Sequence, residues 1–416
     1  MSKHTKIVIL SWEMFPVYAG GLGILTLDLV DELIKQGVEV KVLIPHKKKN
    51  NSDPYVISLE KETRKYYKKN ARVPGFNFKV DHFRPTNRNP SASVPSMFSG
   101  GKSPSTQNLY PNQTPLLTQA FAFAAADYLK EYDFDLIIGM DWMSIPTFVM
   151  LKNSSDAKPF WFYVNSTELD RTNSNKFTGT AKAIFEIEEQ YFPQSDRVVA
   201  ISSITKNILV EAYKVKESNT LVISNHVSFS PQTKGFPELD KGKNVLFIGR
   251  LAPQKGLSFL LDTAERVLSF DRSVKFLIAG DGELLADAVT SVCERQLENN
   301  VLFTGWLNME QKRQLYRSGD LFVMPSPSEP FGLTPLEAII SGVPVISSKS
   351  CGFLDVIPST PTFDYHDTHA FAELILYYLQ NPQKSKELIQ NQKEDLAKHD
   401  WSKEVAKILY EVNKNK

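Results

Sequence analysis

Several features that mark particular classes of protein are scarce in this sequence of 416 residues. It contains only two cysteines, Cys293 and Cys351, which are too few for a disulfide framework and fit a reducing cytoplasm. The formal net charge of +1 gives no overall field that would attract nucleic acid. No apolar run has the length of a membrane span, and no cysteine–histidine cluster has the spacing of a zinc site. We therefore expect a cytoplasmic protein without a metal ion, a cofactor, a nucleic-acid partner or a transmembrane segment.

What the sequence does contain is an apolar run, a loop and an amphipathic helix, repeated along the chain. The run Lys6–Leu10 is too short for the apolar region of a signal peptide, and its apolar character predicts a buried parallel strand. A helix is predicted over Leu25–Gln36, where leucines recur at helical spacing and Gly37 ends the pattern. The other strands predicted in this half are Glu39–Ile44, Leu136–Gly139, Phe160–Val164, Val198–Ile201 and Leu221–Ile223. This alternation predicts a doubly wound, Rossmann-like α/β domain.

A second set of such units follows Phe229–Lys243, a segment with proline, glycine and several charges that we interpret as a linker. The strands predicted after it are Val245–Ile248, Val274–Ala279, Val301–Phe303, Leu321–Met324 and Val345–Ser347. We assign residues 1–228 to a first domain, 229–243 to the linker, 244–400 to a second Rossmann-like domain and 401–416 to a C-terminal helix. The stretch Pro85–Pro115 is rich in proline, serine and asparagine, and it predicts a long surface loop.

The most informative stretch runs from Ser328 to Gly342 and carries two glutamates, Glu329 and Glu337, around a glycine-bearing turn. An apolar run lies just before it, so the order is strand, loop and helix, where open α/β sheets hold ligands. The N-terminus of a helix offers unpaired backbone N–H groups and a partial positive charge, which suit a phosphate group. One carboxylate can accept hydrogen bonds from a ribose, and the other can reach the far end of the same ligand. The spacing therefore fits a sugar nucleotide held along its length.

A structural alternative remains open for the same residues. Thr334 and Glu337 match a capping box, with Pro335 at the first helical position. In that case Glu337 would serve only the end of the helix.

Two other segments point to a phosphate ligand. Arg250 and Lys255 follow the predicted strand Val245–Ile248, where two cations on one loop would neutralise a diphosphate, unless they are a solvated surface pair. Gly20 and Gly21 follow the first predicted strand and let the backbone approach a ligand closely. These glycines do not complete the G-x-G-x-x-G pattern, so a nicotinamide-dependent oxidoreductase is disfavoured.

Together these motifs resemble the retaining glycosyltransferases of the GT-B fold, closest to the group 1 (family 4 and 5) enzymes that include glycogen and starch synthases. Glu329 and Glu337 look like the paired glutamates of that family, and the segment from Gly249 to Gly256 is similar to its phosphate-binding G-R-x-x-x-x-K-G. The segments Ala279–Glu283, Phe303–Gly305 and Glu13–Pro16 agree with it in order and spacing. The resemblance implies two Rossmann-like domains facing a deep cleft, with the C-terminal helix packing back on the first domain.

The resemblance also implies a function. The chain would move a hexose from a nucleoside diphosphate sugar to an acceptor hydroxyl on a glycan or other glycoside, with retention and without a metal ion. Glu337 would hold the ribose, Arg250 and Lys255 the diphosphate, and Glu329 the sugar. The other implied donor-binding residues are Gly20, Gly21, Gly332, Leu333 and Thr334.

The sequence departs from the resembled family at three places. Tyr18 and Ala19 stand where synthases of that family usually have a lysine just before the glycines. Met140 stands where glycogen synthases have histidine, and Asn165 stands where many relatives have a histidine that lies at the reacting sugar. An asparagine can hydrogen-bond a sugar hydroxyl but cannot carry a proton. We therefore place Asn165 beside the reacting carbon, with Asp141 orienting the donor or the acceptor, unless Asp141 only caps the following helix.

Two alternatives for the whole protein remain open. One is a catalytically impaired relative that binds a sugar nucleotide or a partner subunit. The other, a sugar-nucleotide epimerase, is disfavoured because the missing histidines remove ionisable groups from the sugar. The basic stretch Lys61–Lys69 favours a solvated helix face, with peripheral contact to an anionic membrane or a glycan as the alternative.

Overall fold

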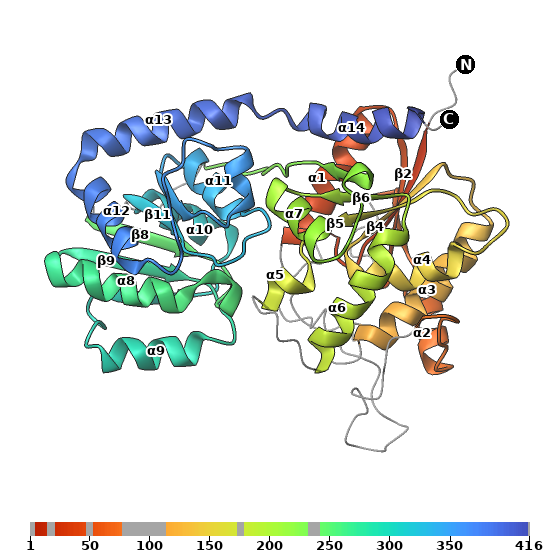
Figure 1. Cartoon of the computed structure of the whole chain (residues 1–416), viewed down its shortest axis with the longest axis horizontal. Coiled ribbons are helices and arrows are strands. Elements are labelled where there is room, and N and C mark those ends of the chain that lie inside the picture. The colour runs from red at the N-terminus through yellow and green to blue at the C-terminus, as the bar shows by residue number, and fades with distance from the viewer. Residues whose placement is uncertain are drawn as a thin grey trace.

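A computed structural model describes residues 5–14, 21–46, 53–76, 114–172, 179–231 and 242–414. These residues form two α/β domains, each built on one sheet (Figure 1). The strand order is β3-β2-β1-β4-β5-β6-β7 in the first sheet and β10-β9-β8-β11-β12-β13 in the second. The strand pairs described in both sheets are parallel. This confirms the two doubly wound domains that the sequence predicts.

The described part of the first domain contains seven strands and the helices that connect them. Its strands are β1 (Lys6–Leu10), β2 (Glu39–Ile44), β3 (Val56–Ser58), β4 (Leu136–Met140), β5 (Phe160–Val164), β6 (Arg197–Ala200) and β7 (Thr220–Val222). Its helices are α1 (Gly21–Lys35), α2 (Glu60–Lys68), α3 (Thr114–Lys130), α4 (Ile145–Leu151), α5 (Glu168–Thr172), α6 (Gly179–Tyr191) and α7 (Ser203–Glu211).

The second domain repeats the same scheme, with six strands in residues 242–414. Its strands are β8 (Lys243–Ile248), β9 (Val274–Ala279), β10 (Val301–Gly305), β11 (Leu321–Met324), β12 (Val345–Ser348) and β13 (Thr362–Phe363). The helices are α8 (Leu257–Phe270), α9 (Leu285–Glu294), α10 (Met309–Arg317), α11 (Leu333–Ile340), α12 (Thr368–Gln380), α13 (Pro382–Lys398) and α14 (Trp401–Lys414).

Both sheets are buried on two faces, which explains their continuous apolar strands. In β8, Val245 and Phe247 belong to the apolar cluster that includes residues of α8 and α12. Leu246 and Ile248, which alternate with them, belong to a different cluster that includes residues of α10 and α11. Because successive side chains of a strand point to opposite faces of the sheet, one short apolar run contributes to the core on both faces.

The last two helices connect the domains. α13 runs along the second domain and α14 along the first (Figure 1). Gln36 at the end of α1 donates to the carbonyl oxygen of Ser402 over 2.8 Å, and Arg197 of β6 forms an ion pair with Glu411. The C-terminal helix therefore lies against the first domain, while the predicted boundaries at 228, 243 and 400 stay predictions.

Some expected element boundaries were wrong. α1 begins at Gly21 rather than Leu25, because the glycine-bearing segment before the leucine stripe is already helical. α3 begins at Thr114, so Pro115 lies in its first turn rather than in a loop. Proline fits there because the N–H that it lacks would have no partner in the helix. The rest of the predicted loop Pro85–Pro115 and most of the predicted linker lie outside the described residues.

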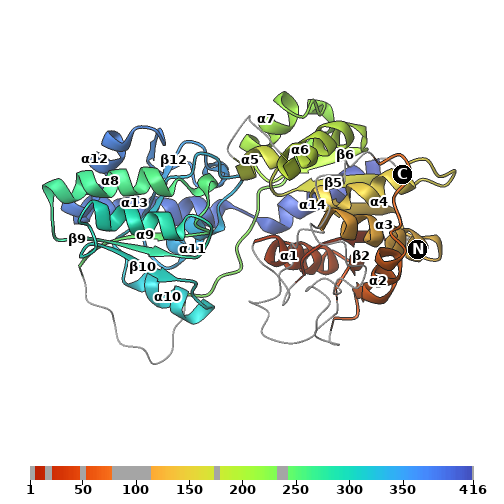
Figure 2. The ribbon, with the colours of Figure 1, turned by 90° about the horizontal axis from the view of Figure 1, so that it is seen from below.

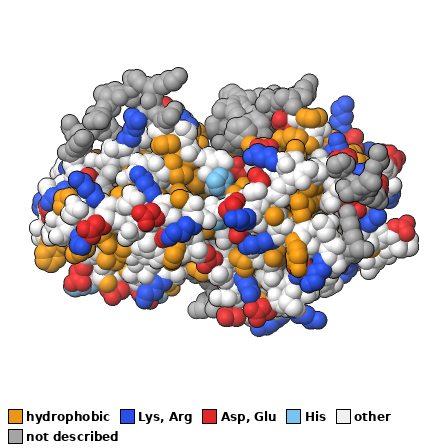
Figure 3. Space-filling model, turned by 90° about the horizontal axis from the view of Figure 1, so that it is seen from above, with side chains coloured by type: hydrophobic (Ala, Val, Ile, Leu, Met, Phe, Trp, Pro, Cys, Tyr) orange, Lys and Arg blue, Asp and Glu red, His pale blue; other side chains and the backbone are white. Residues whose placement is uncertain are grey.

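The surface carries charges of both signs. Viewed from above, cations and carboxylates alternate over both domains (Figure 3). Within the described ranges, no helix combines the length and the apolar character that a membrane span requires.

Candidate active site

The strand order in each sheet marks a place for a ligand. The chain leaves β1 toward β2 on one side and toward β4 on the other, and it does the same at β8 between β9 and β11. Ligands of open α/β sheets bind at such switch points, beyond the carboxyl ends of the strands. Asp141 follows β4 and Asn165 follows β5, while Arg250 follows β8 and Glu329 lies just beyond β11. The topology therefore puts these predicted site residues at or beside the two switch points.

The carboxyl ends of the two sheets meet each other. Ser328 Oγ donates to Asp170 Oδ1 over 2.7 Å, and Ser202 Oγ donates to the carbonyl oxygen of Pro330 over 2.6 Å. Helix α5 lies at the boundary between the domains in two perpendicular views (Figure 1 and Figure 2). A Cβ atom built on Gly21 would lie 3.4 Å from Leu333 Cδ1. Residues predicted for one donor site thus come together from both domains, although Gly20 lies outside the described residues.

Glu329 is buried and held from several directions. Its side chain is paired with Lys255 Nζ, and Ser326 Oγ lies 3.4 Å from Glu329 Oε2. Its backbone N–H donates to Ser350 O, and its carbonyl oxygen accepts from Gly352 N, both over 2.9 Å. In this arrangement the lysine predicted to bind phosphate neutralises the glutamate predicted to face the sugar. Arg250, on the same loop as Lys255, is exposed.

Glu337 lies on α11 and has one oxygen occupied. Its Oε2 atom is paired with Lys312 Nζ and accepts a hydrogen bond from Tyr316 Oη over 2.7 Å. Burial, together with this carboxylate, raises the pKa of Tyr316 well above its ordinary value, so the hydroxyl stays a donor. Oε1 forms no hydrogen bond or ion pair with the described residues and is the atom that a ligand hydroxyl could reach.

Lys312 and Tyr316 were not found from the sequence. They lie four residues apart on α10, so they share one face of that helix. Asn308 begins α10 with a capping box, a pattern that the sequence displays. From the capping box one could have predicted that Lys312 and Tyr316 share one face of a helix. It gives no indication that this face lies opposite Glu337.

The capping-box alternative for Glu337 is wrong. α11 begins at Leu333, its N-cap residue is Gly332, and no side chain caps it. Thr334 and Pro335 are therefore inside the helix. Gly332 has a φ of 101°, which a residue with a side chain rarely adopts, and a Cβ there would lie 3.3 Å from Glu329 Cγ. The first turn of α11 thus lies next to Glu329.

The loop that carries Arg250 and Lys255 packs directly on the strand end beside it. Gly256 has a φ of 70°, and a Cβ at this position would lie 2.1 Å from the carbonyl oxygen of Pro325, just past β11. Only a residue without a side chain permits this approach of one backbone to the other. Gly256 therefore brings the two cations close to the segment that leads to Glu329.

On the first domain, Asp141 and Asn165 are joined. Asp141 has a φ of 52°, and its Oδ1 atom accepts from the Asn165 backbone N–H over 2.7 Å and from Asn165 Nδ2 over 3.4 Å. Burial raises the pKa of Asp141 to about 6, while Arg171 and the N–H groups of Asn165 and Ser166 act in the opposite direction. Its side chain makes no capping bond to the helical turn Trp142–Ser144, so the cap alternative is wrong.

The amide oxygen of Asn165 is the free end of this pair. Asn165 Oδ1 is buried and has no hydrogen-bond partner in the described part of the chain. A buried acceptor without a partner is costly, and a donor from a ligand would satisfy it. Met140, another departure from the resembled family, is fully buried in the apolar core.

Trp306 is a third residue that the sequence analysis did not find. It directly follows β10, at the same carboxyl edge of the second sheet as Arg250, and 65% of it is exposed. An exposed indole has a flat face on which a nucleobase can stack. The run Phe303–Gly305, which was singled out for its spacing, ends immediately before it.

The described residues contain no group of histidine, cysteine, aspartate and glutamate side chains that could hold a metal ion. Two hollows of the described surface lie away from these residues. One of about 510 Å³ lies between α1 and the α13–α14 connection, and one of about 560 Å³ lies between α8 and α12. Strand ends and side-chain contacts define the candidate site.

Comparisons with known proteins all point to glycosyltransferases. The family described as "Glycosyltransferase Family 4" matches residues 19–230, and the one described as "Glycosyl transferases group 1" matches residues 230–395. An uncharacterised glycosyltransferase of Methanocaldococcus jannaschii is 26% identical over 365 residues, which cover 85% of this chain and 82% of that protein.

Solved structures share the whole fold. Sucrose-phosphate synthase from Thermosynechococcus elongatus superposes with a TM-score of 0.70 at 19% identity, over 98% of each chain. Anabaena HepE, solved in complex with UDP and glucose, superposes with a TM-score of 0.66 at 16% identity, over 99% of this chain and 100% of that one. At these identities the two structures show a common fold and no more.

Proposed function

Since this chain belongs to the group 1 glycosyltransferases and has their GT-B fold, we propose that it transfers a hexose from a nucleoside diphosphate sugar to a glycoside hydroxyl. We further propose that transfer retains the anomeric configuration and needs no metal ion. The observation that carries this proposal is the convergence of Lys255, Glu329 and the first turn of α11 at one switch point. The Asp141–Asn165 pair lies on the opposite domain, beside the contact between Asp170 and Ser328.

The donor would lie along the carboxyl edge of the second sheet. Trp306 would stack on the base and Oε1 of Glu337 would accept from the ribose hydroxyls. Arg250 and Lys255 would bind the diphosphate together with the backbone N–H groups of the α11 N-terminus. The Anabaena relative, solved with UDP and glucose, supports UDP as the first nucleotide to test.

The reacting sugar would lie between the domains. The bond from its anomeric carbon to the phosphate breaks, and the acceptor oxygen bonds to the same face of that carbon. The acceptor proton goes to the departing phosphate, so no imidazole is required. Negative charge builds on that phosphate, and preorganised cations stabilise it at that moment. Glu329 and the free Oδ1 atom of Asn165 would accept hydrogen bonds from the sugar hydroxyls.

The first expected result concerns metal ions. UDP should stabilise the protein in the presence of EDTA, because the cations of Arg250 and Lys255 take the place of a metal ion at the diphosphate. A UDP concentration of about 100 times the dissociation constant corresponds to about 2.7 kcal/mol of stabilisation. The measurement is a thermal-shift titration with UDP, GDP and ADP, each with EDTA and with magnesium. Stabilisation only in magnesium would contradict the metal-free site.

The second expected result concerns Asn165. Asn165→Ala should lower donor turnover by roughly 10- to 100-fold, the size of one or two lost hydrogen bonds. Asn165→His should keep or raise the rate. The readout is UDP release from UDP-glucose without an acceptor, so hydrolysis counts as turnover.

Asn381→Ala is the matched control. It removes a single exposed side-chain hydrogen bond, from Asn381 Nδ2 to the carbonyl oxygen of Tyr377, on the second domain. Wild-type protein that binds sugar nucleotides but never turns them over, with no gain from the histidine, would favour a binding protein instead.

A further inference from the structure

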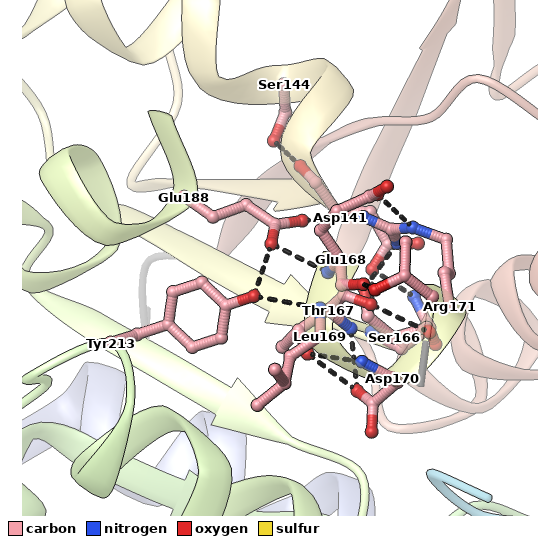
Figure 4. Close-up of polar contacts among 12 residues, drawn as sticks. Asp141, Ser144, Ser166, Thr167, Glu168, Leu169, Asp170, Arg171, Glu188 and Tyr213 are labelled. Atoms are coloured by element: carbon pink, nitrogen blue, oxygen red, sulfur yellow. Dashed lines mark hydrogen bonds and ion pairs between the residues drawn. The ribbon is translucent and has the colours of Figure 1, made fainter. Parts of the chain in front are cut away.

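The segment that we call the β5–α5 turn, residues 165–171, runs from the end of β5 into α5 and is held by side chains of other elements (Figure 4). Asn165 N donates to Asp141 Oδ1 over 2.7 Å, and Glu168 N donates to Glu188 Oε2 over 2.8 Å. Leu169 N donates to Tyr213 Oη over 3.2 Å. The three acceptors belong to the end of β4, to α6 and to the segment after α7, so three separate elements fix the shape of this one turn.

Arg171 is the last residue of the turn, and all three nitrogens of its guanidinium donate hydrogen bonds. Nε donates to Glu168 Oε2 over 2.8 Å, Nη1 to the carbonyl oxygen of Ser166 over 2.7 Å, and Nη2 to Glu188 Oε1 over 2.7 Å. Glu188 is fully buried and also accepts from Tyr213 Oη over 2.8 Å. A guanidinium matches this planar fork of acceptors, which a lysine cannot do.

Four carboxylates surround this one cation. They are Asp141, Glu168, Asp170 and Glu188. Burial raises the pKa of Glu188 to about 7 and that of Asp141 to about 6, and Arg171 opposes the rise in both. The guanidinium therefore favours the ionised form of Asp141, the carboxylate that anchors Asn165.

The same turn reaches the other domain. Asp170 Oδ2 accepts from Thr167 N and Oγ1, both over 2.8 Å, and its Oδ1 accepts from Ser328 Oγ over 2.7 Å. Ser328 directly precedes Glu329. One rigid turn thus contacts the Asp141–Asn165 pair at its start and the sugar-facing loop of the second domain near its end.

We propose that Arg171 is a positioning residue for glycosyl transfer. By fixing the β5–α5 turn it holds Asn165 against Asp141 and keeps Asp170 in reach of the loop that carries Glu329. The proposal rests on the proposed function, since it is the sugar between these groups that Arg171 would serve without touching it.

The test compares Arg171→Met and Arg171→Lys with wild type. Arg171→Met should lower kcat for UDP release from UDP-glucose about 10-fold or more and leave UDP affinity within about 3-fold. If ionised Asp141 supports turnover, the rate falls as pH drops through its pKa. Loss of the cation raises that pKa, so the acid limb should move up by about one pH unit in Arg171→Met. Arg171→Lys keeps a cation, so its acid limb should stay near that of wild type.

A second readout does not depend on activity. In hydrogen–deuterium exchange, peptides covering residues 165–171 should exchange faster in both variants than in wild type, because the forked bonds are lost. The control is Arg295→Met, which removes an arginine paired with Asp262 over 2.7 Å and Glu265 over 3.0 Å, both on the outer helix α8. It should change neither the exchange of this turn nor the pH profile.

If Arg171→Met folds poorly, the double variant Arg171→Met with Glu188→Gln takes its place in the test. The second substitution removes the charge of Glu188, which would otherwise be buried without its partner. Unchanged exchange of the turn, or an equal loss of UDP affinity and turnover, would overturn the positioning role. Wild type that releases no UDP would overturn the proposed function instead, and exchange would still report whether Arg171 holds the turn.

Discussion

Replacing Arg250 and Lys255 together by alanine is expected to lower the affinity for UDP by roughly 150- to 25,000-fold. Each side chain is proposed to make a charge-assisted contact with the diphosphate, and such contacts contribute about 1.5–3 kcal/mol each. Arg250 is exposed on its loop, so its loss costs the folded protein little. Isothermal titration calorimetry with UDP, at low and high salt, measures the effect. The dependence on salt should weaken in the double variant because two cations are gone.

Lys255 requires a further comparison because it also neutralises Glu329, which is 6% exposed. Removing the lysine alone leaves a buried carboxylate without its ion pair, and this lowers stability whatever the ligand does. Lys255→Ala with Glu329→Gln removes that charge as well. If UDP affinity falls equally with and without Glu329→Gln, the loss comes from the phosphate contact and not from the unpaired glutamate.

The control for this prediction lies on the same sheet. Arg272→Ala with Lys275→Ala removes the same two residue types at the opposite, amino end of β9. A general effect of net charge would weaken UDP binding equally in both double variants. A specific site predicts loss only with Arg250 and Lys255. A dissociation constant within about 3-fold of wild type for the Arg250 and Lys255 variant would contradict the diphosphate assignment.

The strands were predictable because both faces of each sheet are buried. Phe160–Val164 and Leu321–Met324 match β5 and β11 residue for residue, since a buried parallel strand is apolar at every position. The start of α1 was less predictable because its first turn contains Gly21 and Gly23, which carry no helical signal. Tertiary position, rather than propensity, makes that turn helical.

The charged part of the site was only half predictable. Arg250 and Glu329 could be proposed because each follows an apolar run and a turn, and the local sequence shows that arrangement. Arg171 and Glu188 could not be proposed, because the sequence does not distinguish a buried arginine–glutamate ion pair from two exposed charged residues. Their pairing depends on α5 and α6 lying against each other, with Tyr213 closing the cluster. Lys312 could not be predicted either. It lies on a polar helix, and its contact with Glu337 joins two helices that the sequence does not place side by side.

Glu337→Ala is expected to weaken UDP binding by about 150-fold while the fold stays intact. Two hydroxyls of one ribose, at the lower value of about 1.5 kcal/mol for each bond to a charged group, give about 3 kcal/mol. The folded protein loses much less. Tyr316 Oη lies 3.1 Å from Thr334 O and can donate there, and Lys312, with 18% of its side chain exposed, can turn to water. Glu337→Gln, which keeps an acceptor for Tyr316 but no charge, should fall between alanine and wild type.

The ribose assignment can be separated from any general damage by the choice of ligand. Wild type should bind UDP more tightly than 2′-deoxy-UDP, because the deoxy nucleotide lacks one hydroxyl for Glu337 Oε1. In Glu337→Ala the two nucleotides should bind alike, since the partner of that hydroxyl is gone. This double comparison isolates the contact from changes that affect both ligands equally. Calorimetry with the two nucleotides provides the four dissociation constants. If the variant still prefers UDP by the wild-type ratio, Glu337 does not hold the ribose, and its bonds to Lys312 and Tyr316 would serve only to join α10 to α11.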